Sequence, residues 1–274
     1  MLLSENIDSF VMTVPDFIDT SVQNNIWMRE RKDCPIDKQL FLDQWYDLYN
    51  TMSSSALIYL MPSVKGLQDQ TYVNSFVILN GSNRIAVISK FRAAGRDGES
   101  IVAENFLRSL HFDVHQCPYF FEGYAELKYV KDNTYIGGYG LRTSEEALDW
   151  MSERFGIKII KIKISNAYLY HLDCNLFIID KDNIILATDD VDRHTLKELE
   201  QVVNIHSIDN SDAKNGMASC IRLGDKILHS AVNVDYMEVV CSILGLTPCP
   251  IDVSESIKSG AMLACFVTPL NYDM

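Results

Sequence analysis

Basic residues are scarce in this sequence, and their scarcity excludes one class of partner. The 274 residues include 24 Lys and Arg against 37 Asp and Glu, which gives a formal net charge of −13. Nucleic-acid binding rests on clustered Lys and Arg, and the sequence has no such cluster. We therefore expect no nucleic-acid partner. An acidic surface instead concentrates cationic small molecules, although in most acidic proteins it serves solubility alone.

Long apolar runs and paired cysteines are missing as well. No apolar run reaches the roughly 18 residues that cross a bilayer, and the N-terminus lacks the basic-then-apolar layout of a signal peptide. We expect a cytoplasmic protein without a membrane partner, while a homo-oligomer stays open. The seven cysteines are odd in number and include no Cys-x-x-Cys pair. We therefore expect no disulfide framework, no metal site and no cofactor.

The sequence does contain a recurring pair of apolar β-type runs separated by a turn signal. The four clear pairs are residues 76–79 with 85–88, 127–130 with 134–136, 175–179 with 184–187, and 218–223 with 226–229. The first pair is joined at 80–83 by Asn-Gly-Ser-Asn, which is typical of a turn. A fifth pair is incomplete, because residues 261–267 match only one strand. We expect its partner near the N-terminus.

Stretches with helical spacing lie between these pairs, at residues 37–51, 100–110, 144–155, 194–203 and 234–244. Ser144 followed by Glu145 and Glu146 is typical of a capped helix start. About five copies of a strand, hairpin and helix predict a ring of ββαβ units around a central channel, folded as one domain over residues 1–274. Without the motifs below, an ordinary α/β or α+β sheet with chance hairpins would be the favoured interpretation.

Three segments contain residues that a core alone does not require. Two carboxylates, Glu122 and Glu126, flank a glycine just before an expected strand. His171 and Asp173 lie two positions apart and would project from one face of a strand. A loop of small residues leads to Cys265. Each feature alone is more often structural, because a cysteine in an apolar run is usually inert and a carboxylate before a strand is usually solvated.

In combination, these groups suit a thiol that attacks a cationic substrate. A cysteine thiol has a pKa of about 8.5, so at neutral pH it needs a cationic neighbour or a cationic substrate to react as a thiolate. Cys265 could obtain either from His171 or from the substrate itself. Asp69, just before an expected strand, could join Glu122 and Asp173 in selecting a planar guanidinium group, which pairs with carboxylates directionally.

The order of these motifs resembles the guanidino-group-modifying, or pentein, superfamily, which includes arginine deiminases, dimethylarginine dimethylaminohydrolases and amidinotransferases. The resemblance is nearest to the arginine dihydrolase-like branch and covers about residues 12–269. The matching segments are 14–17, 24–28, 66–74, 91–99, 138–143 and 170–173, and the last, Tyr-His-Leu-Asp, matches without change. Glu126 replaces the usual Asp and Ala264 replaces a basic or polar residue, which could alter substrate choice or reduce activity.

The resemblance implies a five-bladed α/β propeller and, by position, a set of site residues. It implies Cys265 as the nucleophile, His171 as the general acid and base, and Glu122 as the partner of the substrate and of His171. The substrate-binding residues that it implies are Asp69 and Asp173 for the guanidinium nitrogens, Arg92 and Arg142 for the amino-acid carboxylate, and Asn25 and Asn74, which match asparagines of the dihydrolase-like branch.

We therefore predict a cysteine-dependent hydrolase of the guanidino group of arginine. It would be an arginine dihydrolase or deiminase that releases ammonia through a covalent thiouronium intermediate, without a metal. A dimethylarginine dimethylaminohydrolase and an amidinotransferase-like enzyme are the alternatives within the superfamily. A non-catalytic pentein that only binds a partner is the alternative of a different class, and the complete set of cysteine, histidine and carboxylates argues against it.

Overall fold

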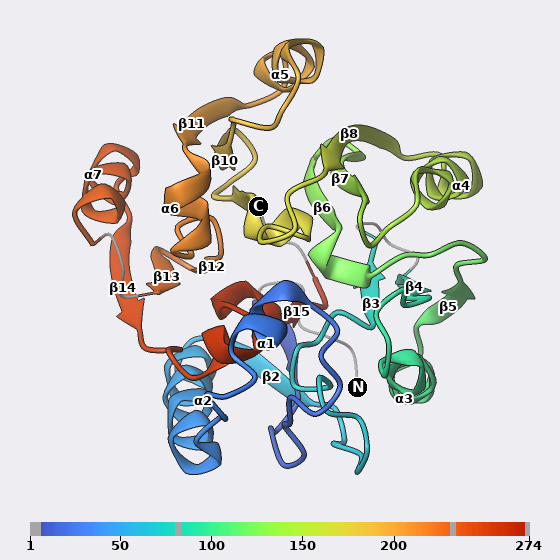
Figure 1. Cartoon of the computed structure of the whole chain (residues 1–274). Coiled ribbons are helices and arrows are strands. Elements are labelled where there is room, and N and C mark those ends of the chain that lie inside the picture. The colour runs from blue at the N-terminus through green and yellow to red at the C-terminus, as the bar shows by residue number, and fades with distance from the viewer. Residues whose placement is uncertain (1–6, 80–83, 231–233, 272–274) are drawn as a thin grey trace.

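The structure, a computed structural model, describes residues 7–79, 84–230 and 234–271. Five three-stranded sheets are arranged as blades around a central axis, along which Figure 1 looks. This arrangement confirms the predicted five-bladed α/β propeller. The turn predicted at residues 80–83 lies outside the described residues.

Four blades share one topology, in which an antiparallel hairpin is followed by a helix on the outside of the ring and by a third strand parallel to the second (Figure 1). In chain order the strands are β3 (Phe76–Ile78), β4 (Ile85–Ile88) and β5 (Asp113–Gln116); β6 (Leu127–Lys131), β7 (Thr134–Gly140) and β8 (Lys158–Ile164); β9 (Leu176–Ile178), β10 (Asn183–Ala187) and β11 (Asn204–Ile208); and β12 (Ile221–Leu223), β13 (Lys226–Ser230) and β14 (Thr247–Ile251). The helices are α3 (Asp97–Ser109), α4 (Glu145–Phe155), α5 (Arg193–Glu200) and α7 (Val234–Leu244). The four predicted hairpins and these four predicted helices are confirmed.

The fifth blade joins the two ends of the described chain. β1 (Ser9–Met12) pairs in parallel with β2 (Leu57–Leu60) and antiparallel with β15 (Thr268–Pro269). The predicted helix α2 (Lys38–Ser53) lies between β1 and β2 in the sequence. The expected strand near the N-terminus is confirmed, but the strand predicted at residues 261–267 is wrong. Leu263–Phe266 forms the 3-10 helix η4, and β15 follows it. Gly260, at φ +78°, turns the backbone away from an extended path just before this helix.

The start of α4 differs in detail from the prediction. Ser144 occupies the N-cap position, but its side chain makes no cap hydrogen bond and instead donates to the carbonyl of Phe120 at 3.4 Å. Glu145 and Glu146 do lie in the first turn, where negative charge is favourable. The helix therefore begins where predicted, without the predicted cap.

Aromatic packing from α2 fixes the segment that contains Cys265. Phe41, Trp45 and Leu48 of this helix are buried in one cluster with Phe266 of η4. The ring centroids of Phe41 and Phe266 are 5.8 Å apart. Each large apolar side chain buried in this way contributes about 1.5–3 kcal/mol, so the position of η4 is strongly determined.

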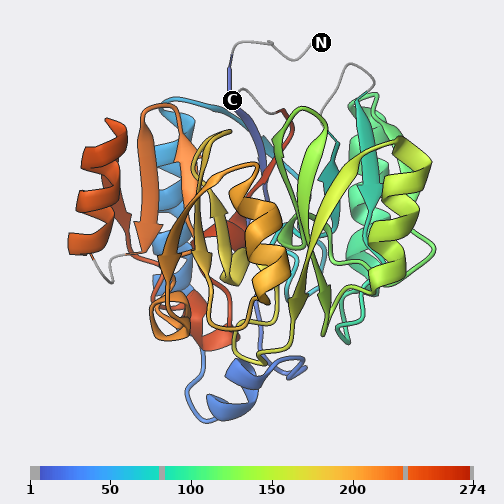
Figure 2. The same ribbon diagram turned by 90° about the horizontal axis from the view of Figure 1, so that it is seen from above.

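The two ends of the ring differ in what covers them. The short helix α1 (Ile26–Glu30) and its adjoining loops cover one end, whereas the termini of the described chain lie at the other (Figure 2). The remaining short helices are η1 (Gly123–Ala125), η2 (Leu172–Cys174), α6 (Asn210–Lys214) and η3 (Ser256–Ser259). Among the described residues, no helix is both long and apolar enough to cross a membrane.

Candidate active site

The predicted site residues come mostly from equivalent places in the blades, the segments that lead into the first strands. Asp69 and Asn74 precede β3, Glu122 precedes η1 and β6, His171 and Asp173 precede β9, and Cys265 lies in η4 just before β15. These strands surround the axis of the ring in Figure 1. The segments that precede them therefore meet near the centre, although they are far apart in the sequence.

A small cavity of about 20 Å³ lies among these segments, on the side of the ring covered by α1. Cys265 and His171 both line it, so the structure brings together the sulfur and the imidazole that the sequence predicts to be partners. Of the other predicted site residues, Asn25, Asp69, Asn74 and Arg142 line the cavity, whereas Glu122, Asp173 and Arg92 do not. The predicted set therefore divides into residues on the cavity wall and residues outside the lining.

Glu122 lies behind His171 and contacts both His171 and Arg142. Its Oε2 atom is 2.7 Å from His171 Nε2 and accepts a hydrogen bond from Arg142 Nη1 at 3.0 Å. Its Oε1 atom accepts from the backbone N–H groups of Arg92 and Ala93. Burial alone would raise the pKa of Glu122, but the hydrogen bond with His171 and the charge on Arg142 hold the pKa well below its usual range. An ionised carboxylate only accepts, so the hydrogen of the contact with His171 lies on Nε2.

The thiol of Cys265 is buried beside a carboxylate. Its side chain is 5% exposed, and Sγ lies 3.8 Å from Asp173 Oδ2. Burial raises the pKa of Cys265 well above its usual range, and the negative charge on Asp173 raises it further. Asp173 therefore does not activate the thiol by itself. The strand predicted around His171 and Asp173 is wrong, because Leu172–Cys174 forms η2.

Two buried oxygen atoms on the cavity lining lack hydrogen-bond partners within the described part of the chain. Asp69 Oδ2 accepts a hydrogen bond from Asn24 Nδ2 at 2.6 Å, but Asp69 Oδ1 has no partner. Asn74 Oδ1 is also buried without one. A buried acceptor without a donor costs about 1–3 kcal/mol. A ligand that brings several N–H groups would satisfy both atoms.

The two predicted carboxylate-binding arginines occupy different environments. Arg142 is 8% exposed, lines the cavity, and lies over the ring of Tyr170 with its guanidinium carbon 4.5 Å from the ring centroid. Arg92 is exposed and lies over the ring of Phe120 at 4.6 Å. Its Nε donates to the carbonyl of Arg142 at 3.3 Å. Arg92 is thus a neighbour of Arg142 and lies outside the cavity lining.

Asn25 lines the cavity and also caps a helix. Its Oδ1 accepts from the backbone N–H of Met28 at 2.9 Å and caps α1, while its Nδ2 donates to the carbonyl of Ser259 at 2.9 Å. A Cβ atom on Gly260 would lie 2.8 Å from Asn25 Oδ1. Asn25 therefore ties α1 to the loop that precedes the cysteine.

Glu126, the other carboxylate near Gly123, has a pKa shifted in the opposite direction to that of Glu122. It is fully buried, and its Oε2 accepts from the backbone N–H of Leu172 at 3.1 Å. Burial, together with the nearby charges of Glu122 and Asp173, raises the pKa of Glu126 well above its usual range. The pKa values of these two glutamates are thus shifted in opposite directions at one site.

Several further lining residues were given no role by the sequence. Tyr170 donates from its hydroxyl to the carbonyl of Gly260 at 2.8 Å, and Asn24 donates to Asp69. Arg96 forms two hydrogen bonds with Glu99, at 2.9 and 2.7 Å, and also donates to the carbonyl of Tyr72. The only signal for them was membership of the matching segments 24–28, 91–99 and 170–173.

The described residues offer no ready metal site. Across residues 7–79, 84–230 and 234–271, no group of three or more His, Cys, Asp or Glu side chains is placed to hold a metal ion. His171 instead contacts Glu122, and Cys265 lies beside Asp173. The arrangement fits acid–base and nucleophilic chemistry by side chains.

Comparison with known proteins identifies relatives over most of the chain. The dimethylarginine dimethylaminohydrolase of Mycobacterium tuberculosis is 23% identical over 258 residues, which are 93% of this chain and 83% of that protein. A bifunctional arginine dihydrolase/ornithine cyclodeaminase of Synechocystis is 20% identical over 261 residues, 93% of this chain. This chain spans only 36% of the length of that protein. No family model matches.

Solved structures show the same fold. The crystal structure of the N-terminal domain of the cyanobacterial arginine dihydrolase, a cysteine-to-serine mutant bound to substrate, has a TM-score of 0.88 at 19% identity. The match covers 96% of this chain and 98% of that domain. Another structure of the domain, covalently bound to a reaction intermediate, also has a TM-score of 0.88.

Proposed function

Because this chain has the pentein fold and resembles the arginine dihydrolase and dimethylarginine dimethylaminohydrolase branch of that superfamily, we propose that it is a cysteine-dependent hydrolase of the guanidino group of arginine. One observation carries the proposal: a buried thiol and a glutamate-bound histidine line one cavity with two unpartnered acceptors, Asp69 Oδ1 and Asn74 Oδ1. A guanidinium group supplies N–H donors in a plane together with the positive charge that the carboxylates require. We propose that residues 1–274 act as one catalytic domain.

The bound substrate would activate the nucleophile. A guanidinium cation beside Cys265 offsets the burial and the Asp173 charge that raise the pKa of the thiol. His171 takes the thiol proton, and Sγ adds to the guanidinium carbon. His171 then gives this proton to the departing ammonia, which leaves a thiouronium on Cys265. Water attacks the thiouronium with His171 as base, and the thiol is restored as citrulline is released.

Binding would use the remaining charged groups at fixed positions. Asp69 and Asp173 pair with guanidinium nitrogens, while Arg142 and its neighbour Arg92 hold the amino-acid carboxylate. Asn74 contributes an amide that can hydrogen-bond a neutral ureido group, whereas Asn25 is already engaged as a helix cap. Because the cavity is only about 20 Å³ in size, the lining side chains must rearrange to admit the substrate.

The decisive experiment separates one hydrolysis from two. A deiminase converts arginine to citrulline and ammonia and stops there, whereas a dihydrolase also converts citrulline to ornithine, ammonia and carbon dioxide. We expect the protein to release ammonia from arginine, and Asn74 favours consumption of citrulline too. Incubation with each compound separately, followed by mass spectrometry of the products, distinguishes the two. Absence of ammonia from arginine and from its methylated and decarboxylated relatives would support a non-catalytic binding protein instead.

Methylated arginine is the second candidate substrate. The similarity to the mycobacterial dimethylarginine dimethylaminohydrolase extends over 83% of that protein, which favours this alternative. Both reactions use the same attack on the guanidinium carbon and differ in the leaving amine. Under this alternative, dimethylamine would be released from dimethylarginine faster than ammonia from arginine at equal substrate concentration.

Asp69→Asn is expected to lower kcat/KM for the guanidino substrate by about 10- to 100-fold, because one charge-assisted hydrogen bond is lost. Steady-state ammonia release measures the effect. Asp47→Asn, a matched change at an exposed position of α2, should leave kcat/KM unchanged. Equal kinetics for the Asp69 variant and the wild type would remove Asp69 from the guanidinium site.

A further inference from the structure

A larger cavity lies at the opposite end of the ring, on the side of the chain termini. Its volume is about 600 Å³, which falls within the range of about 300–1,000 Å³ that is typical of small-molecule sites. Ile7 and Asn271, near the two ends of the described chain, line it. None of the residues to which we give a role in the reaction lines it. The cavity is therefore separate from the proposed active site and has no function in the mechanism above.

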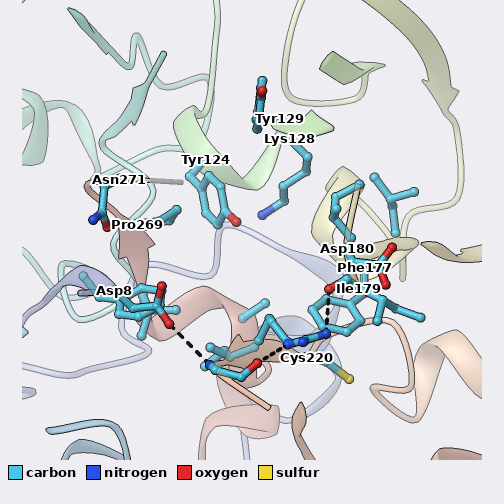
Figure 3. Close-up of a pocket in the computed structure, with 18 of the residues that line it drawn as sticks. Asp8, Tyr124, Lys128, Tyr129, Phe177, Ile179, Asp180, Cys220, Pro269 and Asn271 are labelled. Atoms are coloured by element: carbon cyan, nitrogen blue, oxygen red, sulfur yellow. Dashed lines mark hydrogen bonds between the residues drawn. The ribbon is translucent and has the colours of Figure 1, made fainter. Parts of the chain in front are cut away.

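One buried cation points into this cavity. Lys128, on β6, is only 4% exposed, yet its ammonium group extends into the cavity beside Tyr124 (Figure 3). Its Nζ atom lies 3.3 Å from the centroid of the Tyr124 ring. Within the described ranges of the chain, this ammonium has no hydrogen bond and no ion pair. A buried charge is costly unless it is paired, so Lys128 is poised to accept an anionic partner.

The other charged side chains of the cavity already have partners. Arg222 donates to the carbonyl of Ile179 at 3.2 Å. Asp180 accepts from Asn183 Nδ2 at 2.9 Å within its own turn. Asp8 accepts from the backbone N–H of Gly224 at 3.3 Å. Among the charged side chains of the lining, Lys128 is thus the one without a hydrogen bond within the described residues.

The rest of the wall is largely apolar. Phe10, Phe177, Ile178, Ile221 and Val267 contribute side chains from the first strands of the blades and from the segment that follows η4. A hydrophilic ion such as free phosphate would leave these surfaces unused, and a dianion would find only one ammonium to pair with. A cationic ligand would be repelled by Lys128. The class of ligand that fits the cavity is therefore a molecule with an apolar body and a single negative charge.

We propose that this cavity binds a small organic anion, a carboxylate attached to an aliphatic or aromatic body, with its carboxylate paired to Lys128. The ammonium is charged under ordinary conditions, because burial lowers the pKa of Lys128 only to about 8. The carboxylates of Asp173 and Glu126 and the thiols of Cys265 and Cys174 oppose this decrease from the interior. In this desolvated position the pairing is stronger than a surface ion pair.

Isothermal titration calorimetry of the full chain at pH 7 tests the proposal, with decanoate as the probe and decanamide as its uncharged counterpart. We expect one equivalent of decanoate to bind, and decanamide to bind at least about tenfold more weakly, since a hydrogen bond to a charged group is worth about 1.5–3 kcal/mol. Lys128→Met keeps an unbranched side chain of nearly the same length and removes the charge, so it should cause a similar loss. Lys197→Met, at an exposed position of α5, is the matched control and should bind like the wild type.

A second variant locates the bound probe. Ile178→Trp adds a large side chain to the cavity wall and should also reduce decanoate binding at least about tenfold, which excludes binding at the arginines of the proposed active site. Circular dichroism establishes that each variant is folded. The proposal is overturned if the wild type shows no saturable binding of decanoate, if decanamide binds equally well, or if either folded variant binds decanoate like the wild type. Because heat is measured without turnover, the result does not depend on the proposed catalytic function.

Discussion

Cys265→Ser is expected to lower the rate of ammonia release by about 10⁴-fold or more, because Cys265 carries the only thiol among the described residues that line the cavity. The hydroxyl of serine is a far weaker nucleophile than a thiolate, and the bound cation that activates the thiol is insufficient for it. Since the change replaces one small side chain by another, the fold should survive. Single-turnover kinetics with arginine, followed by mass spectrometry of the intact chain, measures both the rate and the loss of the covalent adduct.

Cys34→Ser provides the control for this experiment, because Cys34 is an exposed free cysteine outside the cavity lining. It should retain the activity of the wild type and still form the adduct. Substantial ammonia release by the Cys265 variant, with the adduct found elsewhere on the chain, would identify a different nucleophile.

Glu122→Gln is expected to affect both activity and stability. The change leaves the buried guanidinium of Arg142 without its carboxylate, which costs about 3–5 kcal/mol of unfolding free energy. It also replaces the ionised acceptor of the His171 hydrogen bond by a neutral amide, which weakens the contact that orients His171, so kcat should decrease by about 10²- to 10⁴-fold, the usual contribution of a positioned acid or base. Urea denaturation and steady-state kinetics measure the two effects separately.

Glu126→Gln is a closely matched control, because Glu126 is equally buried and lies on the other side of Gly123. Burial raises the pKa of Glu126 and so favours its neutral form, whereas the pKa of Glu122 is lowered; the amide is therefore a closer mimic of the native side chain at Glu126 than at Glu122. We expect much smaller losses of activity and stability than for Glu122→Gln. Equal effects of the two changes would show that Glu122 acts by filling space and not by its charge.

The difference in unfolding free energy between the wild type and Glu122→Gln should decrease as the pH is lowered. The pKa of Glu122 is lower in the folded chain than in the unfolded chain, where it is about 4.3. Its stabilisation is therefore fully present above that ordinary value and is lost as the pH decreases through the lower folded pKa. The two proteins should differ by a constant amount between pH 6 and pH 8 and converge in acid. A difference that increased in acid would contradict the assignment of an ionised Glu122.

The sequence predicted the blades well where both strands of a hairpin are local. Residues 76–79 and 85–88 form one such pair, because alternating apolar runs and a turn between them are short-range signals. The fifth blade was incomplete in the prediction because β15 has only two residues and pairs with β1 from the other end of the chain. The small apolar residues of η4 resemble a strand in composition, and tertiary packing against α2 decides otherwise.

For the site, the sequence predicted residue types better than their positions. The resemblance paired Cys265 with His171 through motif order, and both residues line one cavity. Spacing did not show that Arg92 is exposed and outside the lining while Arg96, four positions later, lines the cavity. Nor did it distinguish Glu122 from Glu126, because their opposite pKa shifts depend on partners supplied by other blades.

The closure of the ring has a consequence for biosynthesis. β15 begins shortly after Cys265 and completes the blade that β1 opens, so the proposed nucleophile and the last strand leave the ribosome almost together. During translation, a nascent chain would hold its histidine and carboxylates without a sulfur opposite them until Cys265 is added. Premature termination or trimming upstream of this point would thus remove the proposed nucleophile and β15 together. The product would be an open ring without the proposed activity.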